Sequence, residues 1–389
     1  MAETALAQRG KTFDTLTILL RAGLQQGADL AEIPMLATDR EVQQALKKSL
    51  AQHGMLGYCL PVISRMGGFE DQIVEGMRRR FRNGTTHRLQ ILGLGRRISS
   101  RLDRDGIAHI HLKGFSLSQR LFSDPAERSY TDVDMLVRIG DVLNVDQILK
   151  EMGCRPFNDL DRMSSTQRRL FCRLRHDIVY WDPTGRIKIE VHWRFNRARP
   201  LSEREYDDLF ARQCNVPIGG WDVPSLSLED EAGYLIDHGV KHGWLRLKWL
   251  YDIYVLSERY PPSILENISG VPGLSANIRD VRIAIGLSRH IFAGEAIADL
   301  TDDAGIAAEI NRFYQMIAEQ DLDMPLGEDP RISLQLLRGI SVRDKLHRTL
   351  PALLNIPVWG VDPPPLGWWP LFALTGPISW LRRKGLLKN

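Results

Sequence analysis

Two aspartates stand one residue apart in the stretch YTDVDMLVRI, residues 130–139. The stretch is short, apolar and rich in β-branched residues, which is typical of a β-strand. Because the side chains of a strand alternate between its two faces, Asp132 and Asp134 would share one face. Two carboxylates on one face of a half-buried strand are costly unless a positive partner lies beside them.

A second predicted strand supplies a third acid. In the segment RIKIEVHWRF, residues 186–195, apolar residues alternate with polar ones, so that Glu190 and His192 share the polar face. If this strand lies beside the strand of Asp132 and Asp134 in one sheet, Glu190 completes a three-carboxylate cluster.

Three crowded carboxylates repel one another, and a pair of divalent cations removes that repulsion. Two ions about 4 Å apart bind a triphosphate and lower the pKa of an attacking hydroxyl. Mg²⁺ suits such a site because it prefers carboxylates and substrate phosphates to an all-protein cage. The sequence therefore predicts a two-metal Mg²⁺ site with Asp132, Asp134 and Glu190 as catalytic ligands. His192 would position an acceptor, act as a general base, or support the site from behind it.

A Lys-Gly turn precedes the aspartates in HLKGFSLSQRLFSDPAERSYTDVDMLV, residues 111–137. Gly114 lets a phosphate approach the backbone, and Lys113 adds a positive charge. Arg128 lies just before the aspartates and would neutralise a transferred or leaving phosphate group. An isolated Asp-x-Asp is a weak signal, because solvated acids at a strand end explain it equally well. The prediction of a metal site is stronger because the Asp-x-Asp pair follows the turn and a helix. It also precedes a hairpin that carries one Glu on the polar face.

The elements that must position these residues follow the order helical, mixed and helical. Residues 1–105 have helical periodicity, residues 106–222 contain the predicted strands, and residues 223–350 return to a helical pattern. Residues 351–389 are rich in proline and tryptophan and are predicted to be extended or loop. We therefore predict an α+β fold, with a mixed β-sheet core flanked by N-terminal and C-terminal helical regions.

Several elements have clear local signals. Asp39 is a predicted N-cap, and Gly106 ends a stretch that indicates one long helix or two. Residues 176–195 indicate a hairpin around Asp-Pro-Thr-Gly, and residues 115–124 a short helix. Residues 227–260 combine a helix-start signal with a long apolar stripe. Further helices are predicted at 275–293, 303–320 and 331–349.

Three separated motifs resemble a known family. They are HLKGFSL with LFSDPAERSYTDVDMLV, then IEVHW, then HGVKHGWLRLKWLYDI. Together they resemble the nucleotidyltransferase superfamily with its polymerase-β-like fold, and within it the poorly characterised nucleotidyltransferase family often found in bacterial biosynthetic gene clusters. The resemblance covers about residues 40–260. It implies metal-dependent transfer of a nucleotidyl group from an NTP donor to an acceptor, with Asp132, Asp134 and Glu190 as the metal ligands.

The turn departs from the pattern of that superfamily. Gly-Gly or Gly-Ser is usual there, whereas this chain has Lys113-Gly114-Phe115-Ser116. The departure leaves open a donor other than an ordinary NTP.

The resemblance also implies that a helical domain closes over the nucleotide. His242, Lys248 and Asp252 would then line the cleft, with Lys248 contacting phosphate and paired with Asp252 four residues on. Trp244 and Trp249 would stack on a base or belong to the core. The predicted nucleotide-binding residues are Lys113, Gly114, Arg128, His192 and Lys248.

A histidine pair in DHGVKHGW raises the question of zinc. His238 and His242 lie four residues apart and so share one face of a helix. No third ligand lies nearby, so histidines at the edge of a buried helix face are the simpler interpretation.

Composition sets limits on the class of protein. The chain has 389 residues and a net charge of +3, which does not by itself require a nucleic-acid partner. Its four cysteines are scattered without a Cys-x-x-Cys pair, which suits a reducing, cytoplasmic location. No secretory signal and no apolar run of bilayer length is evident. The C-terminal tail, with its closing basic residues, is predicted to pack on the body or to contact a membrane surface.

Three functional hypotheses follow. The first is a Mg²⁺-dependent nucleotidyltransferase that acts on a small-molecule, sugar or peptide natural-product acceptor. The second keeps the enzyme class and makes RNA the acceptor, because basic clusters occur at 77–82 and 168–176. The third is a catalytically degenerate nucleotide-binding scaffold, motivated by the missing Gly-Ser element.

Overall fold

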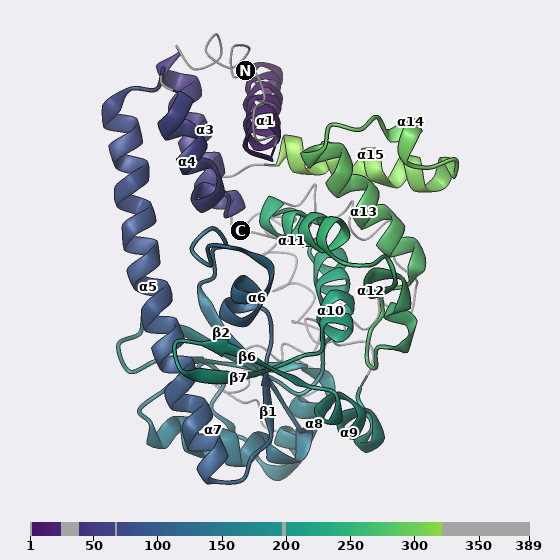
Figure 1. Ribbon diagram of the computed structural model, residues 1–389. Coiled ribbons are helices and arrows are strands. Elements are labelled where there is room, and N and C mark those ends of the chain that lie inside the picture. The colour runs from purple at the N-terminus through teal and green to yellow at the C-terminus, as the bar shows by residue number, and fades with distance from the viewer. Residues whose placement is uncertain (1, 25–38, 67, 197–199, 321–389) are drawn as a thin grey trace.

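A seven-stranded sheet lies beneath a large group of helices in the view of Figure 1. The predicted α+β fold, with a mixed sheet and helical regions before and after it in sequence, is confirmed. The predicted helix at 331–349 and the Pro/Trp-rich tail lie outside the part of the chain that the structure describes. This computed structural model describes residues 2–24, 39–66, 68–196 and 200–320.

The N-terminal region is helical, as predicted, with α1 (Ala2–Leu24), α3 (Arg40–His53), α4 (Leu56–Met66) and α5 (Asp71–Arg104). The Asp39 side chain accepts a hydrogen bond of 2.8 Å from the Glu41 N–H, which confirms it as the N-cap of α3. Helix α5 is a single helix that runs from the α3–α4 pair down to the sheet (Figure 1). With a rise of about 1.5 Å per residue, it is about 50 Å long.

The strands have the order β3-β4-β5-β2-β1-β7-β6. The central strand β2 pairs in parallel with β5 and antiparallel with β1. Strands β4 and β5 form the predicted antiparallel hairpin. The strand bounds are β1 (His109–His111), β2 (Asp132–Val137), β3 (Arg155–Pro156), β4 (Asp177–Trp181), β5 (Lys188–His192), β6 (Cys214–Ile218) and β7 (Trp221–Ser225).

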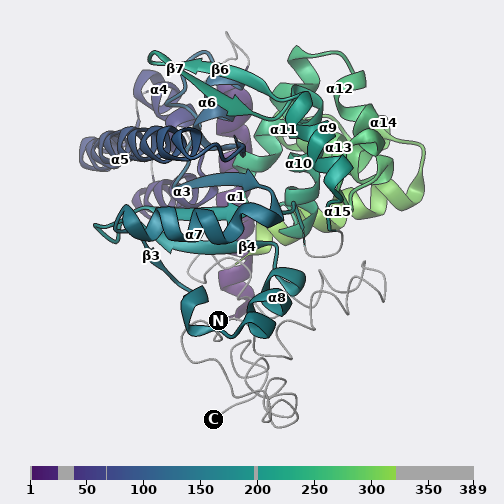
Figure 2. The same ribbon diagram turned by 90° about the horizontal axis from the view of Figure 1, so that it is seen from below.

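Each face of the sheet has its own hydrophobic core. Val133, Met135 and Val137 of β2 pack with the C-terminal half of α5, with α7 (Val142–Glu151) and with α8 (Ser165–Leu174). Figure 2 shows α7 and part of α5 crossing this face. Leu136 belongs to the second core, which includes α6 (Gly114–Leu121), α10 (Leu228–Lys241) and the N-terminal helices. The face of the sheet that carries Leu136, and with it Asp132 and Asp134, is therefore covered by helices from the N-terminal and the C-terminal regions.

The C-terminal helices confirm two further predictions, since α13 (Ile278–Phe292) and α15 (Ala304–Glu319) lie within the predicted ranges 275–293 and 303–320. The apolar stripe of 227–260 is divided between α10 and α11, because Gly243 and Trp244 adopt positive φ values of 62° and 56°. The Trp244 ring fills the space beside Gly239, where any Cβ would lie 2.1 Å from it. The helices are α10, α11 (Leu247–Arg259), α12 (Ser263–Glu266), α13 (Ile278–Phe292), α14 (Ile297–Leu300) and α15 (Ala304–Glu319).

One hairpin is absent from the predicted elements. Strands β6 and β7 turn at Gly219 and Gly220, both at positive φ, and β7 extends the sheet beside β1. Helix α9 (Glu203–Ala211) precedes the hairpin and opens with a Ser202–Glu205 capping box. Short 3₁₀ turns complete the described elements: η2 (Ile139–Asp141), η3 (Leu160–Arg162) and η4 (Asn267–Gly270).

Candidate active site

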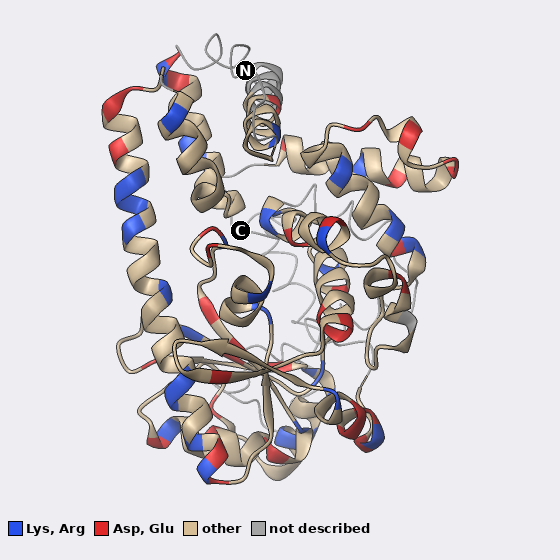
Figure 3. Cartoon of the chain, in the orientation of Figure 1, with Lys and Arg blue, Asp and Glu red and all other residues tan. Residues whose placement is uncertain are grey.

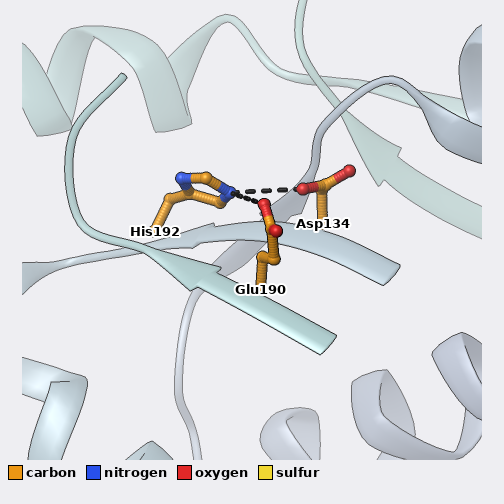
Figure 4. Close-up of side chains that lie close together, drawn as sticks. All are labelled: Asp134, Glu190 and His192. Atoms are coloured by element: carbon orange, nitrogen blue, oxygen red, sulfur yellow. Dashed lines mark hydrogen bonds and ion pairs between the residues drawn. The ribbon is translucent and has the colours of Figure 1, made fainter. Parts of the chain in front are cut away.

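The predicted carboxylates meet where β2 lies beside β5. The register of these parallel strands pairs Asp132 with Lys188 and Asp134 with Glu190. The structure thus places Glu190 beside the aspartates, as the alternation of the two strands predicts. In Figure 4 the side chains of Asp134, Glu190 and His192 point toward one another above the strands.

Asp134, Glu190 and His192 form the tight part of this cluster. His192 Nε2 lies 3.2 Å from Asp134 Oδ1 and 3.4 Å from Glu190 Oε2. One ligand-type atom from each residue lies within 4.8 Å of the other two, and no other such His/Cys/Asp/Glu group occurs in the described part of the chain. The third predicted acid, Asp132, lies outside this group of three, and Lys188 connects it to Glu190.

Two ammonium groups neutralise the acids. Lys188 Nζ lies 2.6 Å from Glu190 Oε1 and 3.4 Å from Asp132 Oδ2, so it bridges these two carboxylates. Lys113 Nζ lies 3.4 Å from Asp134 Oδ2. Repulsion among the acids is therefore relieved by the chain's own cations, a role that the sequence interpretation reserved for metal ions alone.

The electrostatics of the cluster are strongly coupled. Burial raises the pKa of Asp134, although the Lys113 charge opposes it. Burial alone would raise the pKa of Glu190, but the His192 hydrogen bond and the charges of His192, Lys113 and Lys188 hold that pKa well below its ordinary value. Burial disfavours the His192 cation, yet its bonds to Asp134 and Glu190 raise the pKa of the imidazole to about 9. The two neighbouring carboxylates thus favour the protonated form of His192.

The residues fit a divalent cation. Asp134 is 3% exposed, and its buried Oδ2 atom accepts no hydrogen bond and has the Lys113 ammonium 3.4 Å away as an ion-pair partner. A metal ion could replace that ion pair at the same carboxylate oxygen. Oxygens of Glu190 and Asp132 and the Nε2 atom of His192 provide further ligand atoms close by. A histidine binds a metal ion only in its deprotonated form, so an ion bound there would require His192 to lose its proton. The ion would also take the place of the protein cations that now lie beside the carboxylates.

The Lys113-Gly114 turn has an unusual backbone. Lys113 has φ 45° and ψ −132°, a conformation that is strained for any residue with a Cβ, and Gly114 also has a positive φ. The Lys113 N–H donates to Glu231 Oε1 at 3.2 Å, and the Leu112 N–H donates to Asp134 O at 3.0 Å. The turn is thus tied to α10 on one side and to β2 on the other.

Two nucleotide-binding residues of the sequence interpretation have other partners. Arg128 is buried and forms a bidentate pair with Asp252 at 2.8 and 2.9 Å, so Asp252 does not pair with Lys248 as predicted. Lys248 Nζ instead donates to Ser129 O at 3.2 Å. Because Arg128 is committed to a buried carboxylate, its guanidinium holds α11 against the loop before β2. Its fit to the phosphate-binding role is correspondingly weaker.

A pocket of about 740 Å³ opens above the cluster. Its floor includes Lys113, Gly114, Asp132, Asp134 and Glu190, and its upper walls come from the α3–α4 turn, α5 and the start of α11. Figure 3 shows the Lys and Arg residues along the N-terminal half of α5. Lys and Arg outnumber Asp and Glu by seven to four in the lining, which favours an anionic ligand. The seven are Arg80, Arg88, Lys113, Arg128, Lys188, Arg246 and Lys248.

The structure does not support a zinc site at His238 and His242. The rings of His238 and His242 lie 4.6 Å apart between centroids, but they belong to no group of three potential ligands among the described residues. Both residues line the pocket, together with Trp249. Trp244, in contrast, is fully buried, so its alternative role in the core is the one that the structure supports.

The sequence of the whole region from α3 to α12 identifies the family. A family described as uncharacterised nucleotidyltransferases matches residues 39–268. The chain belongs to this family. The match extends from α3 across the sheet to the start of the C-terminal helical region, so all the residues that line the pocket lie within the matched segment.

Other comparisons add little. No curated protein matches the chain. Among the described residues, no helix combines the length and apolar character needed to cross a membrane.

The structure adds residues that the sequence interpretation missed. Lys188 is visible in the strand pattern, but its bridging position depends on the register with β2. Glu231 gives no local signal, because its partner Lys113 is 118 residues away. Arg80 belongs to the basic cluster at 77–82, whose arginines are exposed on α5, and this residue also borders the pocket.

Proposed function

We propose that the protein transfers a nucleotidyl group from a Mg²⁺-bound NTP to a small-molecule, sugar or peptide natural-product acceptor. The observation that carries this proposal is the pairing of Asp134 with Glu190 on adjacent parallel strands, beside the strained Lys113-Gly114 turn at the floor of a basic pocket. Family membership supports the general reaction class. The structural setting supports the particular residues.

In this proposal Asp132, Asp134 and Glu190 hold two Mg²⁺ ions. The ions would supply charge neutralisation on the phosphates and a lower pKa for the acceptor hydroxyl. The buried, hydrogen-bond-free Oδ2 atom of Asp134 supports this assignment. A metal-bound state would free the Lys113 and Lys188 ammonium groups, which now contact the acids.

The phosphates would bind at the Lys113-Gly114 turn. Gly114 has no Cβ to obstruct close approach, and a Cβ placed there would meet nothing nearer than Asp132 O at 4.0 Å. Lys113 Nζ already lies above the carboxylate end of the pocket, and Lys248 lines the same pocket from α11. One cation on the floor and one on the α11 wall suit a triphosphate, which carries charge along its whole length.

His192 would act beside the metal ligands. Its Nε2 atom faces both Asp134 and Glu190, so it can orient them or, once its proton has left, accept a proton from the acceptor hydroxyl. The raised pKa of its imidazole supports the orienting role, because a protonated Nε2 donates to the carboxylates.

Turnover tests this proposal. Purified protein is incubated with Mg²⁺, each of the four α-labelled NTPs and a pool of candidate hydroxyl acceptors, and pyrophosphate release and label transfer are followed. Wild type and Asp222→Asn, an exposed acid of β7 in the same sheet, should be active, and Asp134→Asn should lose activity at least 100-fold. Equal activity of Asp134→Asn and wild type would contradict the proposal.

The RNA-acceptor hypothesis makes a different prediction. Phosphate contacts by Lys and Arg would make tRNA binding fall steeply with salt. Arg78, Arg79 and Arg82 on the exposed face of α5 are the residues to replace in that test. A salt-independent response would remove this alternative.

A further inference from the structure

The wall of the pocket beside α11 is aromatic, whereas its floor is charged. Trp249, His238 and His242 all line the pocket. The rings of His238 and Trp249 lie 4.9 Å apart in an edge-to-face arrangement, and those of His242 and Trp249 lie 5.3 Å apart at 37°. All three residues are partly exposed and line the pocket, so this part of its wall is made of aromatic side chains in mutual contact.

This aromatic surface is connected to the phosphate end. Lys113 Nζ lies 5.8 Å from the centre of the Tyr234 ring, which lies 6.1 Å from His238. The neighbour of Trp249 in sequence, Lys248, lines the same pocket and donates to Ser129 O, three residues before Asp132. The Tyr234 ring therefore connects the aromatic wall to the turn that would hold the phosphates, since it contacts His238 on one side and Lys113 on the other.

His238 is an uncharged part of this wall. Burial lowers the pKa of its imidazole well below the ordinary value, and the charges of Lys113, His242, Lys241 and Lys248 act in the same direction. An uncharged imidazole beside the Trp249 indole can stack on a flat heterocycle, and it has no charge with which to attract a phosphate. This wall thus differs in chemistry from the cationic surfaces of the same pocket.

Trp244 and Trp249 differ in burial, although both pack in or against the same hydrophobic core. Trp244 is 0% exposed and fills the space beside Gly239. Trp249 is only partly buried and borders the pocket. A stacking platform requires an indole that borders the ligand pocket, a position that Trp249 has and Trp244 does not.

We infer that Trp249, with His242 and His238 beside it, is the stacking surface for the nucleobase of the donor. The inference rests on the proposed function, because it assigns one end of the same pocket to the base and the other to the triphosphate. It also names the ligand class: a nucleoside triphosphate, distinguished by its base from an inorganic polyphosphate. Stacking accepts any base, so affinities for the four NTPs should follow stacking strength, with purines ahead of pyrimidines.

A comparison of two kinds of ligand distinguishes binding of the base from binding of the phosphates. The probes are each NTP and inorganic tripolyphosphate, both with Mg²⁺, measured by calorimetry and by tryptophan fluorescence. The variants are Trp249→Leu and Trp249→Phe, with Trp181→Phe as the matched control, since Trp181 is a half-exposed indole on β4 outside the pocket. Far-ultraviolet circular dichroism checks that each variant is folded.

We expect NTPs to quench wild-type fluorescence, and this quenching to disappear in Trp249→Leu and Trp249→Phe but not in Trp181→Phe. Trp249→Leu should weaken NTP binding by about 5- to 100-fold and change tripolyphosphate binding less than twofold. Trp249→Phe, which keeps an aromatic face, should weaken NTP binding less than Trp249→Leu does.

Two results would overturn the inference in distinguishable ways. Unchanged NTP affinity in a folded Trp249→Leu, with Mg²⁺-dependent binding of both probes, would remove the base site and leave the proposed function intact. No Mg²⁺-dependent binding of either probe by wild type would remove the proposed function and the base site together.

Discussion

The main-chain N–H of Lys113 donates to the buried carboxylate of Glu231, 118 residues further along the chain, at 3.2 Å. The same carboxylate accepts a 2.8 Å hydrogen bond from Arg120. Lys113 has φ 45° and ψ −132°, so this contact helps to hold a strained backbone in place. Helix α10 thereby fixes the turn that aims the Lys113 ammonium at Asp134.

The strained backbone at Lys113 predicts that glycine is more stabilising than alanine at this position, the reverse of their usual order. Lys113→Gly and Lys113→Ala both remove the ammonium group and differ only in the Cβ. Because that Cβ occupies a backbone region suited to glycine, Lys113→Gly should be more stable than Lys113→Ala by about 1–2 kcal/mol. Urea denaturation measures the difference. The usual order, with alanine more stable, would show that the backbone at this turn relaxes.

Glu231 should be important for stability as well as for the turn. Replacing it with alanine leaves the Arg120 guanidinium, 12% exposed, without its carboxylate partner. Removal of one member of a buried pair typically costs about 3–5 kcal/mol, and we expect Glu231→Ala to lose that much in denaturant titrations. Glu231→Gln keeps an acceptor for the Lys113 N–H and should lose less. A loss below about 1 kcal/mol for Glu231→Ala would contradict this interpretation.

The Arg128–Asp252 pair predicts coupled effects. Arg128→Met and Asp252→Leu should each destabilise the protein by about 3–5 kcal/mol, because each leaves one buried charge unpaired. The double variant should recover much of that loss, since neither charge remains. Additive losses in the double-mutant cycle would mean that Arg128 and Asp252 act independently, and would favour the phosphate role of Arg128 again.

Lys248 predicts a dependence of nucleotide affinity on pH. Burial and the nearby Arg128 charge lower the pKa of its amine to about 8. The ammonium is therefore present below pH 8 and is lost as the pH rises through that value. If Lys248 contacts phosphate, the affinity for Mg²⁺–NTP should be constant from pH 6.5 to 7.5 and fall above pH 8. Lys248→Arg should remove most of this fall, and an identical profile for Lys248→Arg and wild type would rule out the contact.

The carboxylate cluster could be predicted from the sequence, because the alternation of side chains between the two faces of a strand can be read from a few neighbouring residues. Asp132 and Asp134, and Glu190 on the later strand, each follow from a period of two, and only the pairing of β2 with β5 had to be assumed. The helix starts at Asp39 and Ser227 were likewise predictable, since a cap is defined within a few residues.

The rest depends on long-range contacts or conflicting signals. The pairing of Arg128 with Asp252 joins residues 124 positions apart, so no local pattern contains it. For β6 and β7, the Gly-Gly turn indicates a hairpin, but Pro217 and Pro224 within the strands argue against one. The pocket itself combines three separated helical segments with the sheet, which only the folded chain brings together. The domain limits at 105, 222 and 350 stay predictions.

Calorimetric titration with ATP, GTP, CTP and UTP, with and without Mg²⁺, tests the central assignment most directly. It compares wild type with Asp134→Asn, and with Asp222→Asn as the surface control. We predict Mg²⁺-dependent binding by wild type and by Asp222→Asn, and its loss in a folded Asp134→Asn. Binding that needs no Mg²⁺, or that survives Asp134→Asn unchanged, would contradict a metal–nucleotide site at β2 and β5.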